Sequence, residues 1–243
     1  MRLALEEWRP GKSGTPAFPP FSALARPLRK WTKLALYRAE YGFSPPPPET
    51  DLVGYETLVD FIRAHSLLEI PGDLVEIGAF CGGGTCKLAK SIRKAAQEKT
   101  LHVVDCFDIT LDQTLCESGF RMADFYFRLL KGRSQKEVFF RTTRGLRNIS
   151  VIAADSKTVQ LPVDRICFAF VDGNHSPDYV RSDFSLVWPR LSPGGVAAFH
   201  DYGFDLPKVT STLDELCAHH RHEISVKSVH DEKHILFIQK RKG

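Results

Sequence analysis

Residues 74–84 read Leu-Val-Glu-Ile-Gly-Ala-Phe-Cys-Gly-Gly-Gly. A short apolar run carries an acid near its end and then turns through glycines into an amphipathic segment that begins at Thr85. This order predicts a buried β-strand, a tight turn and the first turn of a helix. Gly78 permits the tight turn, and Gly82 opens a run of three glycines without side chains where the helix starts. We therefore expect a turn at the end of a strand that a ligand can approach closely.

The spacing of the acid and the glycines excludes two common nucleotide-binding motifs. The pattern from Glu76 to Gly82 is Glu-x-Gly-x-x-x-Gly, so the Gly-x-Gly-x-x-Gly fingerprint of dinucleotide-binding proteins is not met. The glycine run is not followed by Lys-Ser or Lys-Thr, so it is not a P-loop either. The spacing resembles motif I of class I S-adenosylmethionine (SAM) methyltransferases. The alternative is a glycine turn that only joins a strand to a helix.

The composition is that of a soluble protein with one α/β domain and an appendage. The chain has 243 residues, of which 43% are hydrophobic and 26% are charged. Its six cysteines have no metal-ligand spacing and include no Cys-x-x-Cys pair, so we expect reduced thiols and a cytoplasmic location. No apolar run reaches the length of a transmembrane segment, and we expect none.

The uneven distribution of charged residues predicts that the chain has two parts. Residues 1–48 hold eight Lys or Arg and three Asp or Glu, whereas residues 49–243 hold 25 and 26. The second part is nearly neutral, which argues against nucleic acid as a partner. We expect residues 1–48 to be a basic, proline-containing extension with a helix at 26–41. This helix either packs on its own domain, or on a second subunit in a homo-oligomer, or lies on a membrane surface.

Alternating elements predict the fold of residues 49–243. Strands are expected at 73–77, 101–106, 149–154, 165–171, 195–200, 222–229 and 234–240. Helices are expected at 52–62, 84–95, 177–188 and 207–219. Such alternation is typical of a doubly wound, mostly parallel seven-stranded α/β sheet with helices on both faces. The last two strands predict an antiparallel hairpin at the sheet edge, an ending that distinguishes the methyltransferase sheet from the ordinary dinucleotide-binding sheet.

Polar side chains follow five of these strands at the point where each strand ends. They are Glu76, Asp105, Asp155-Ser156, Asp172-Gly173-Asn174-His175 and His200-Asp201. Each of them alone could be a helix cap or a turn residue. In an open parallel sheet, however, ligands bind beyond the carboxyl ends of the strands, so together these residues predict a site.

Three further segments make the resemblance to methyltransferases more specific. Residues 170–183 read Phe-Val-Asp-Gly-Asn-His-Ser-Pro-Asp-Tyr-Val-Arg-Ser-Asp, residues 191–195 read Leu-Ser-Pro-Gly-Gly, and residues 199–202 read Phe-His-Asp-Tyr. With the glycine turn, they resemble class I SAM-dependent methyltransferases, and within these the subgroup near the catechol and macrocin O-methyltransferases. The resemblance covers about residues 70–240. It implies a Rossmann-like methyltransferase fold, SAM as cofactor, and methylation of a hydroxyl of a small molecule or sugar.

The resemblance also implies roles for residues of the cofactor site. It assigns SAM contacts to Glu76, Gly78, Gly82, Asp105, Asp155 and Ser156. Glu76 would order the amino group of SAM, and Asp105 would accept hydrogen bonds from both ribose hydroxyls. Asp155 would meet the adenine amino group.

A divalent metal is the second group that the resemblance implies. Its ligands would be Asp172 and Asp201, whose hard oxygens suit Mg²⁺ or Mn²⁺. The chain departs from the subgroup at the third ligand position, where His175 or His200 would have to contribute; with histidine, iron or zinc would also be tolerated. Asp172 and His175 are the predicted catalytic residues. Without a metal, His175 would act as the base that removes the hydroxyl proton.

Residues 107–148 exceed the length that a strand-to-strand crossover needs. The segment contains aromatic and basic residues, namely Phe120, Arg121, Phe125, Tyr126, Phe127, Arg128, Lys131, Arg133 and Lys136. It could fold over the site and recognise a ring with an anionic group, or form an ordinary amphipathic helix. Two other functions remain open for the whole chain. One is a SAM- or nucleotide-binding partner without catalysis, and the other is a related fold member with different chemistry, such as a hydroxylase-associated protein.

Overall fold

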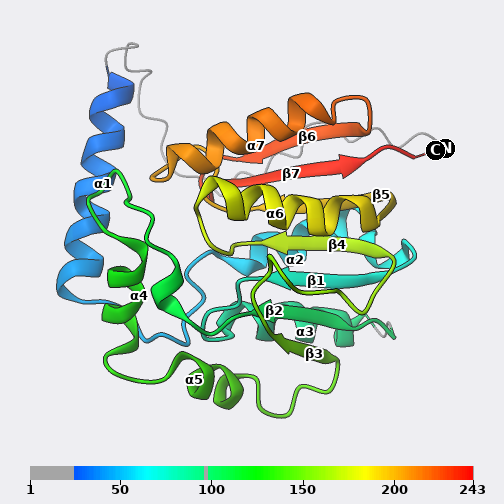
Figure 1. Cartoon of the computed structure of the whole chain (residues 1–243), viewed down its shortest axis with the longest axis horizontal. Coiled ribbons are helices and arrows are strands. Elements are labelled where there is room, and N and C mark those ends of the chain that lie inside the picture. Colours follow the sequence, from blue (N-terminus) through cyan, green and yellow to red (C-terminus); the bar gives the residue numbers. More distant parts are fainter. Residues whose placement is uncertain (1–24, 96–97, 243) are drawn as a thin grey trace.

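Strand β1 (Asp73–Ile77) lies near the centre of a seven-stranded sheet in the computed structural model, which describes residues 25–95 and 98–242. The other strands are β2 (Leu101–Asp105), β3 (Ile149–Ala153), β4 (Ile166–Val171), β5 (Leu191–Phe199), β6 (Ile224–His230) and β7 (Ile235–Lys240). Their order in the sheet is β3-β2-β1-β4-β5-β7-β6 (Figure 1). The strands from β3 to β5 are parallel, and β7 runs antiparallel to both β5 and β6. The predicted parallel sheet with a closing antiparallel hairpin is confirmed.

Seven α-helices accompany the sheet in the described part of the chain. They are α1 (Ala25–Phe43), α2 (Tyr55–Ala64), α3 (Gly83–Lys94), α4 (Met122–Leu130), α5 (Gln135–Thr142), α6 (Pro177–Val187) and α7 (Pro207–His219). Short 3₁₀ turns occupy Leu67–Glu69, Ile109–Leu111 and Trp188–Arg190. None of the helices in these described ranges combines the length and apolar character needed to cross a membrane.

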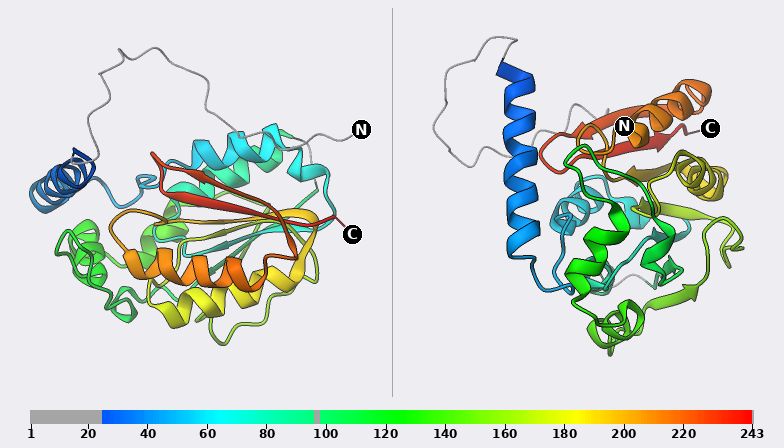
Figure 2. Two further views of the ribbon diagram at one scale, coloured as in Figure 1. Left: turned by 90° about the horizontal axis from the view of Figure 1, so that it is seen from above. Right: turned by 60° about the vertical axis from the view of Figure 1, so that its left-hand side comes forward.

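Helices cover both faces of the sheet, as a doubly wound fold requires (Figure 2, left). On one face, α2 and α3 pack Leu58 and Leu88 against Leu74 of β1. On the other face, α6 and α7 form the core with Val75 and Ile77 of the same strand. The alternation along β1 follows from the two-residue period of a strand, which turns successive side chains to opposite faces.

Two predicted boundaries shift for local reasons. The helix expected at 52–62 begins at Tyr55, because the Asp51 carboxylate accepts the N–H groups of Gly54 at 2.8 Å and Tyr55 at 2.7 Å. These bonds satisfy backbone donors at the start of the helix. The strand expected at 195–200 already begins at Leu191, where it pairs with Ile166 of β4.

Helix α1 stands beside α4 at the end of the sheet where the site lies (Figures 1 and 2, right). It matches the predicted helix at 26–41. Leu34 is buried, and the rings of Tyr37 and Tyr41 pack against Phe125 of α4. The helix therefore contacts its own chain, which was one of the three arrangements considered for it. Residues 1–24 of the predicted extension lie outside the described residues.

Candidate active site

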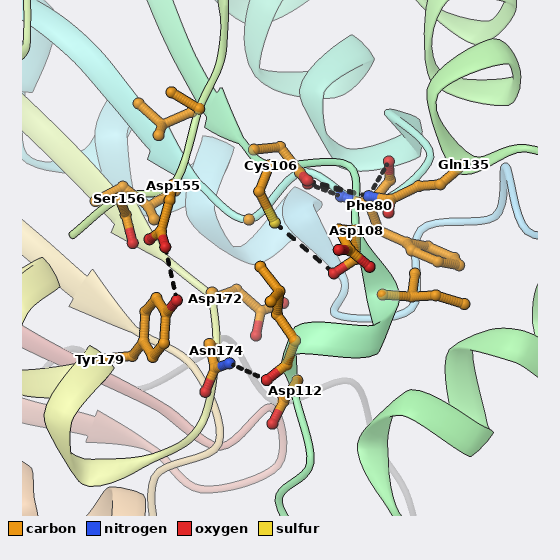
Figure 3. A pocket seen from close by; sticks show the side chains of 18 of the residues that line it. Phe80, Cys106, Asp108, Asp112, Gln135, Asp155, Ser156, Asp172, Asn174 and Tyr179 are labelled. Atoms are coloured by element: carbon orange, nitrogen blue, oxygen red, sulfur yellow. Dashed lines mark hydrogen bonds between the residues drawn. The ribbon is translucent and has the colours of Figure 1, made fainter. Parts of the chain in front are cut away.

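Two cavities open at the carboxyl ends of the parallel strands. Cavity I has a volume of about 620 Å³ and lies at the ends of β1, β2, β3 and β4 (Figure 3). Cavity II has a volume of about 1160 Å³ and extends towards α1, α4 and the loop after β5. Four residues line both cavities: Gly78, Phe80, Tyr126 and Asp172. The cavities therefore meet at the end of β1 and β4, where ligand sites of open α/β sheets are expected.

The predicted glycine turn forms the shared wall. Gly78 has φ 82°, and a Cβ atom there would lie 2.0 Å from the carbonyl oxygen of Asp172. Its N–H donates to the carbonyl of Val104 at 2.9 Å, while the N–H of Asp172 donates to the carbonyl of Ile77 at 2.8 Å. Only glycine fits this position, because both its conformation and its distance from β4 exclude a side chain.

Asp105 lines cavity I, but its carboxylate already has several partners. It accepts hydrogen bonds from the N–H groups of Ala79 at 2.9 Å, Phe80 at 3.0 Å and Phe107 at 2.7 Å. The side-chain amide of Gln135 adds contacts at 3.1 and 3.2 Å to the two oxygens of Asp105. Phe80 has a positive φ of 47°, a conformation that these bonds help to hold. In this arrangement Asp105 orders the loop after β1.

Two other residues of the predicted cofactor set line neither cavity. Gly82 precedes α3 with φ 81°. Glu76 is fully buried and accepts hydrogen bonds from the hydroxyl groups of Tyr55 and Thr85, each at 2.7 Å. Burial raises the pKa of Glu76 to about 7, although both hydroxyl donors act in the opposite direction. Glu76 thus joins α2 to α3 beneath the glycine turn, and its carboxylate is separated from a ligand in either cavity.

Glu76 makes the stability of the fold depend on pH. Its pKa is about 7 in the folded chain against 4.5 for an ordinary glutamate, so the unfolded chain loses this proton first as the pH rises. The free energy of unfolding should therefore fall by about 3 kcal/mol between pH 4.5 and 7 through this residue. Glu76→Gln should remove this part of the pH dependence in denaturant unfolding at pH 5 and 8. The exposed Glu69→Gln serves as control, and equal pH dependence in all three proteins would contradict the assignment.

Asp155 and Ser156 form the wall of cavity I next to β3 (Figure 3). The Asp155 carboxylate accepts the hydroxyl of Tyr179 at 2.8 Å and the N–H of Lys157 at 2.9 Å. The ammonium of Lys157 lies 4.0 Å from the centre of the Tyr179 ring. This wall combines an aromatic face with an acid and a hydroxyl, which suits a planar ring with amino groups.

A second acid, Asp108, lines cavity I three residues after Asp105 (Figure 3). One of its oxygens accepts both the N–H of Thr110 at 2.9 Å and its hydroxyl at 2.6 Å. Its other oxygen has no hydrogen-bond partner among the residues that the structure describes. Asp108 was not among the predicted site residues, because it is the second acid at the end of β2 and the prediction took only the first.

The ends of β4 and β5, together with the loop that carries Asp112, form what we call the acid–histidine cluster: Asp112, Asp172, His175, His200 and Asp201. His175 is buried, with Nδ1 2.5 Å from Asp112 Oδ2 and Nε2 2.8 Å from Asp201 Oδ2. Its Nε2 also lies 3.7 Å from Asp172 Oδ1. His200 Nδ1 lies 3.1 Å from that same oxygen and 3.3 Å from Asp201 Oδ2.

Charge within the cluster shifts the pKa values of its members. Burial would lower the pKa of His175, but the hydrogen bond to Asp112 and the nearby carboxylates of Asp172 and Asp201 outweigh it and raise the pKa well above its usual value. Burial would also lower the pKa of His200, but the carboxylates of Asp201 and Asp172 outweigh it and raise this pKa to about 10. Burial would raise the pKa of Asp201, but His200 and His175 hold it well below its usual value. The cluster thus contains strongly ionised carboxylates that require positive charge beside them.

Three members of the cluster suit a divalent metal ion. Ligand atoms of Asp172, His175 and Asp201 all lie within 4.8 Å of one another. The Nε2 atom of His175 has no hydrogen-bond partner, since its 2.8 Å contact with Asp201 lacks hydrogen-bond geometry. Asp112 pairs with Nδ1, an arrangement that leaves Nε2 for a metal. The residues therefore fit such an ion, and the predicted pair of carboxylates gains His175 as a third donor.

Asp112 was missed by the sequence analysis. It is buried in the loop after the 3₁₀ turn Ile109–Leu111, 63 residues before His175. Nothing in the surrounding pattern marks it, because its partner is far away in the sequence. The segment 107–148 that contains it does cover the site: Phe125 and Tyr126 of α4 line cavity II. Its five predicted basic residues line neither cavity, so the expected basic contact with an anionic acceptor is absent from the described walls.

The family of the chain follows from comparison with known proteins. Residues 75–202, more than half of the sequence, match the family model described as a methyltransferase domain. The chain therefore belongs to this methyltransferase family. No curated protein sequence matches it.

Solved structures agree on the fold. The O-methyltransferase NovP has a TM-score of 0.60 and 18% identity, with 77% of this chain and 79% of NovP covered. CalS11, a calicheamicin methyltransferase, has a TM-score of 0.52 and 14% identity, with 94% and 99% covered. TomG, an O-methyltransferase from Streptomyces achromogenes, has a TM-score of 0.50 and 16% identity, with 87% and 89% covered. At these identities the likeness concerns the fold, and the predicted class I methyltransferase fold is confirmed.

Proposed function

We propose that this protein transfers a methyl group from SAM to a hydroxyl group of a small molecule. The observation that carries this proposal is the junction of cavities I and II at Gly78, Phe80, Tyr126 and Asp172, beside the acid–histidine cluster. Methyl transfer requires donor and acceptor to be held in line at contact distance. Two cavities that share one wall meet this requirement, with the donor in cavity I and the acceptor in cavity II.

Cavity I suits SAM, which supplies an activated methyl group when bound. The turn at Gly78 lets a ligand approach the backbone, and the wall of Asp155, Ser156 and Tyr179 offers contacts for adenine. For the ribose hydroxyls, the free oxygen of Asp108 is better suited than Asp105, whose oxygens are occupied by the loop. Our proposal therefore assigns the ribose contact to Asp108 and loop ordering to Asp105.

This assignment predicts different results for the two acids. Asp108→Asn should weaken SAM binding by about tenfold in calorimetry, because a hydrogen bond to a charged acceptor contributes roughly 1.5–3 kcal/mol. The free energy of unfolding should change little, since the Asp108 side chain bonds only locally to Thr110. Asp105→Asn should instead destabilise the protein by about 1–3 kcal/mol through the loop. Unchanged SAM affinity in Asp108→Asn would contradict the ribose assignment.

For the metal we propose Asp172, His175 and Asp201 as ligands of Mg²⁺ or Mn²⁺. When bound, such an ion would act as a Lewis acid and lower the pKa of the acceptor hydroxyl. Asp172 lies in the wall of both cavities, so its carboxylate borders donor and acceptor alike. His175 lines neither cavity I nor cavity II, and both of its nitrogens face carboxylates. We therefore propose that His175 is a ligand rather than the base, and that Asp112 orients its ring.

One experiment separates this proposal from its rivals. The purified protein is denatured and examined by mass spectrometry for SAM or S-adenosylhomocysteine, and transfer of radioactive methyl from SAM to a set of hydroxyl compounds is then measured with Mg²⁺ and after chelation. Metal-dependent transfer supports the proposal. Retained SAM without transfer to any compound would favour a binding partner without catalysis. A protein that binds neither SAM nor its product would contradict the proposed function.

A further inference from the structure

We infer that helix α1 is one wall of the acceptor site and that its tyrosines, Tyr37 and Tyr41, select a planar aromatic hydroxyl compound. This inference rests on the proposed function and names the substrate class of that site. It concerns cavity II, which extends from the acid–histidine cluster to α1.

Four tyrosine side chains line cavity II: Tyr37 and Tyr41 from α1, Tyr55 from α2 and Tyr126 from α4. The Tyr55 hydroxyl already donates to Glu76 at 2.7 Å. The hydroxyl groups of the other three tyrosines have no hydrogen-bond partner among the described residues. Tyr37, Tyr41 and Tyr126 are half-buried, so their hydroxyl groups are accessible to a ligand that enters the cavity. Burial, and after it the nearby Asp201 carboxylate, raises the pKa of Tyr37, which places this ring close to the cluster. Three unpaired hydroxyls around one cavity point to polar groups of a ligand as their partners.

Aromatic side chains form the wall of cavity II around these hydroxyl groups. The ring of Tyr37 lies 4.4 Å from that of Tyr41 and 6.1 Å from that of Phe125, measured between centroids. Phe204, in the loop after β5, meets Tyr37 edge to face at 6.2 Å. Rings contributed by three separate segments surround the cavity with aromatic faces and edges. Such a surface binds another aromatic ring by offset stacking and edge contacts.

The polar groups of cavity II explain why a sugar is less suitable. Asp51 is already bound to backbone N–H groups and Lys87, and Asp205 is bound to Ser118 at 2.6 Å. Glu232 and Lys233 also line the cavity but are exposed. Besides His234, the half-buried polar side chains left for a ligand are therefore the three tyrosines and the cluster members that line the cavity, Asp172, His200 and Asp201. A sugar would bury hydroxyls around its whole ring without enough partners, which is unfavourable.

Helix α1 is held in place by contacts outside the cavity. The Arg38 guanidinium donates to the carbonyl of Ser118 at 3.1 Å, and that of Arg128 donates to the carbonyl of Gly42 at 3.5 Å. Leu34 is only 2% exposed. Both ribbon views place α1 alongside α4 (Figures 1 and 2). The helix is thus a fixed wall of the site, although the sequence assigned it to a separate extension.

A matched pair of probes tests the inference in the full chain. 2,3-Dihydroxynaphthalene and decahydronaphthalene-2,3-diol carry the same two neighbouring hydroxyls, and only the first is flat and aromatic. Their binding is measured by calorimetry with and without saturating S-adenosylhomocysteine. We expect the aromatic probe to bind at least about tenfold more tightly than the saturated one. Tyr37→Ala and Tyr41→Ala should each weaken its binding by about tenfold and leave S-adenosylhomocysteine affinity unchanged.

Control variants separate recognition from folding. Trp31→Ala removes an aromatic side chain that is 57% exposed on the same helix and should change probe binding less than about twofold. Tyr37→Phe and Tyr41→Phe keep the ring packing and should lose only the part of the affinity that the hydroxyl supplies. Equal binding of the two probes, or unchanged binding in both alanine variants, would overturn the inference. Failure to bind S-adenosylhomocysteine would instead contradict the proposed function, while the probes alone still test cavity II.

Discussion

Replacing Gly78 with alanine is expected to disrupt the turn after β1 and to abolish SAM binding. The new Cβ would lie 2.0 Å from the carbonyl oxygen of Asp172, a backbone atom that cannot rotate away. The φ angle of 82° adds a conformational cost for any residue with a side chain. We expect a loss of about 4 kcal/mol or more in the free energy of unfolding. Denaturant unfolding and SAM calorimetry measure the two effects.

Gly145 provides a matched control for this variant. It also has a positive φ, 86°, but an added Cβ would meet nothing within 4 Å. The free energy of unfolding of Gly145→Ala should therefore fall only by the conformational cost of the positive φ, about 1–2 kcal/mol. This variant should bind SAM normally. A similar loss of stability in both variants would mean that β1 and β4 do not approach each other as closely as the structure has them.

The sheet could be predicted from the sequence because its signals are local. The apolar run and glycines around Gly78 specify a strand and a turn within a dozen residues, and the closing hairpin carries its own pattern. The start of α2 at Tyr55 could not be predicted from periodicity, since the side chain of Asp51 sets it. Side-chain caps of this kind decide boundaries only once the local backbone has formed.

The candidate site was predictable in part for a similar reason. Asp172, His175 and Asp201 follow neighbouring strands, and the geometry of a parallel sheet brings strand ends together. The direction of a side chain at such an end is not encoded in the pattern: Glu76 turns to Tyr55 and away from the cavities. The partner Asp112 and the helix that carries Tyr37 are brought to the site by packing over long sequence distances, which no local signal reports.

Asp201→Asn is expected to lower methyl transfer by roughly a hundredfold to a thousandfold, with SAM affinity nearly unchanged. Asparagine keeps the shape of the side chain but removes the charge of one of three proposed metal ligands. Asp201 lines cavity II and not cavity I, so the cofactor contacts remain. Turnover with Mg²⁺ or Mn²⁺, Mn²⁺ binding by calorimetry and SAM binding should be measured on the same preparations.

Asp112→Asn distinguishes loss of a metal ligand from loss of the residue that orients one. Asp112 pairs with the Nδ1 atom of His175 and is not itself a proposed ligand. Loss of such a partner lowers metal affinity or activity by roughly 10–100-fold, so added Mn²⁺ should restore much of the turnover in Asp112→Asn but not in Asp201→Asn. Asp178→Asn, whose carboxylate is exposed on α6, should behave like the unmodified protein. A mechanism with a protein base and no metal would give a different result. Chelation would leave turnover unchanged, and none of the variants would change Mn²⁺ binding. That result would remove the metal from the proposal and reopen the role of base, which the sequence predicted for His175 but for which His200 is the histidine that lines cavity II.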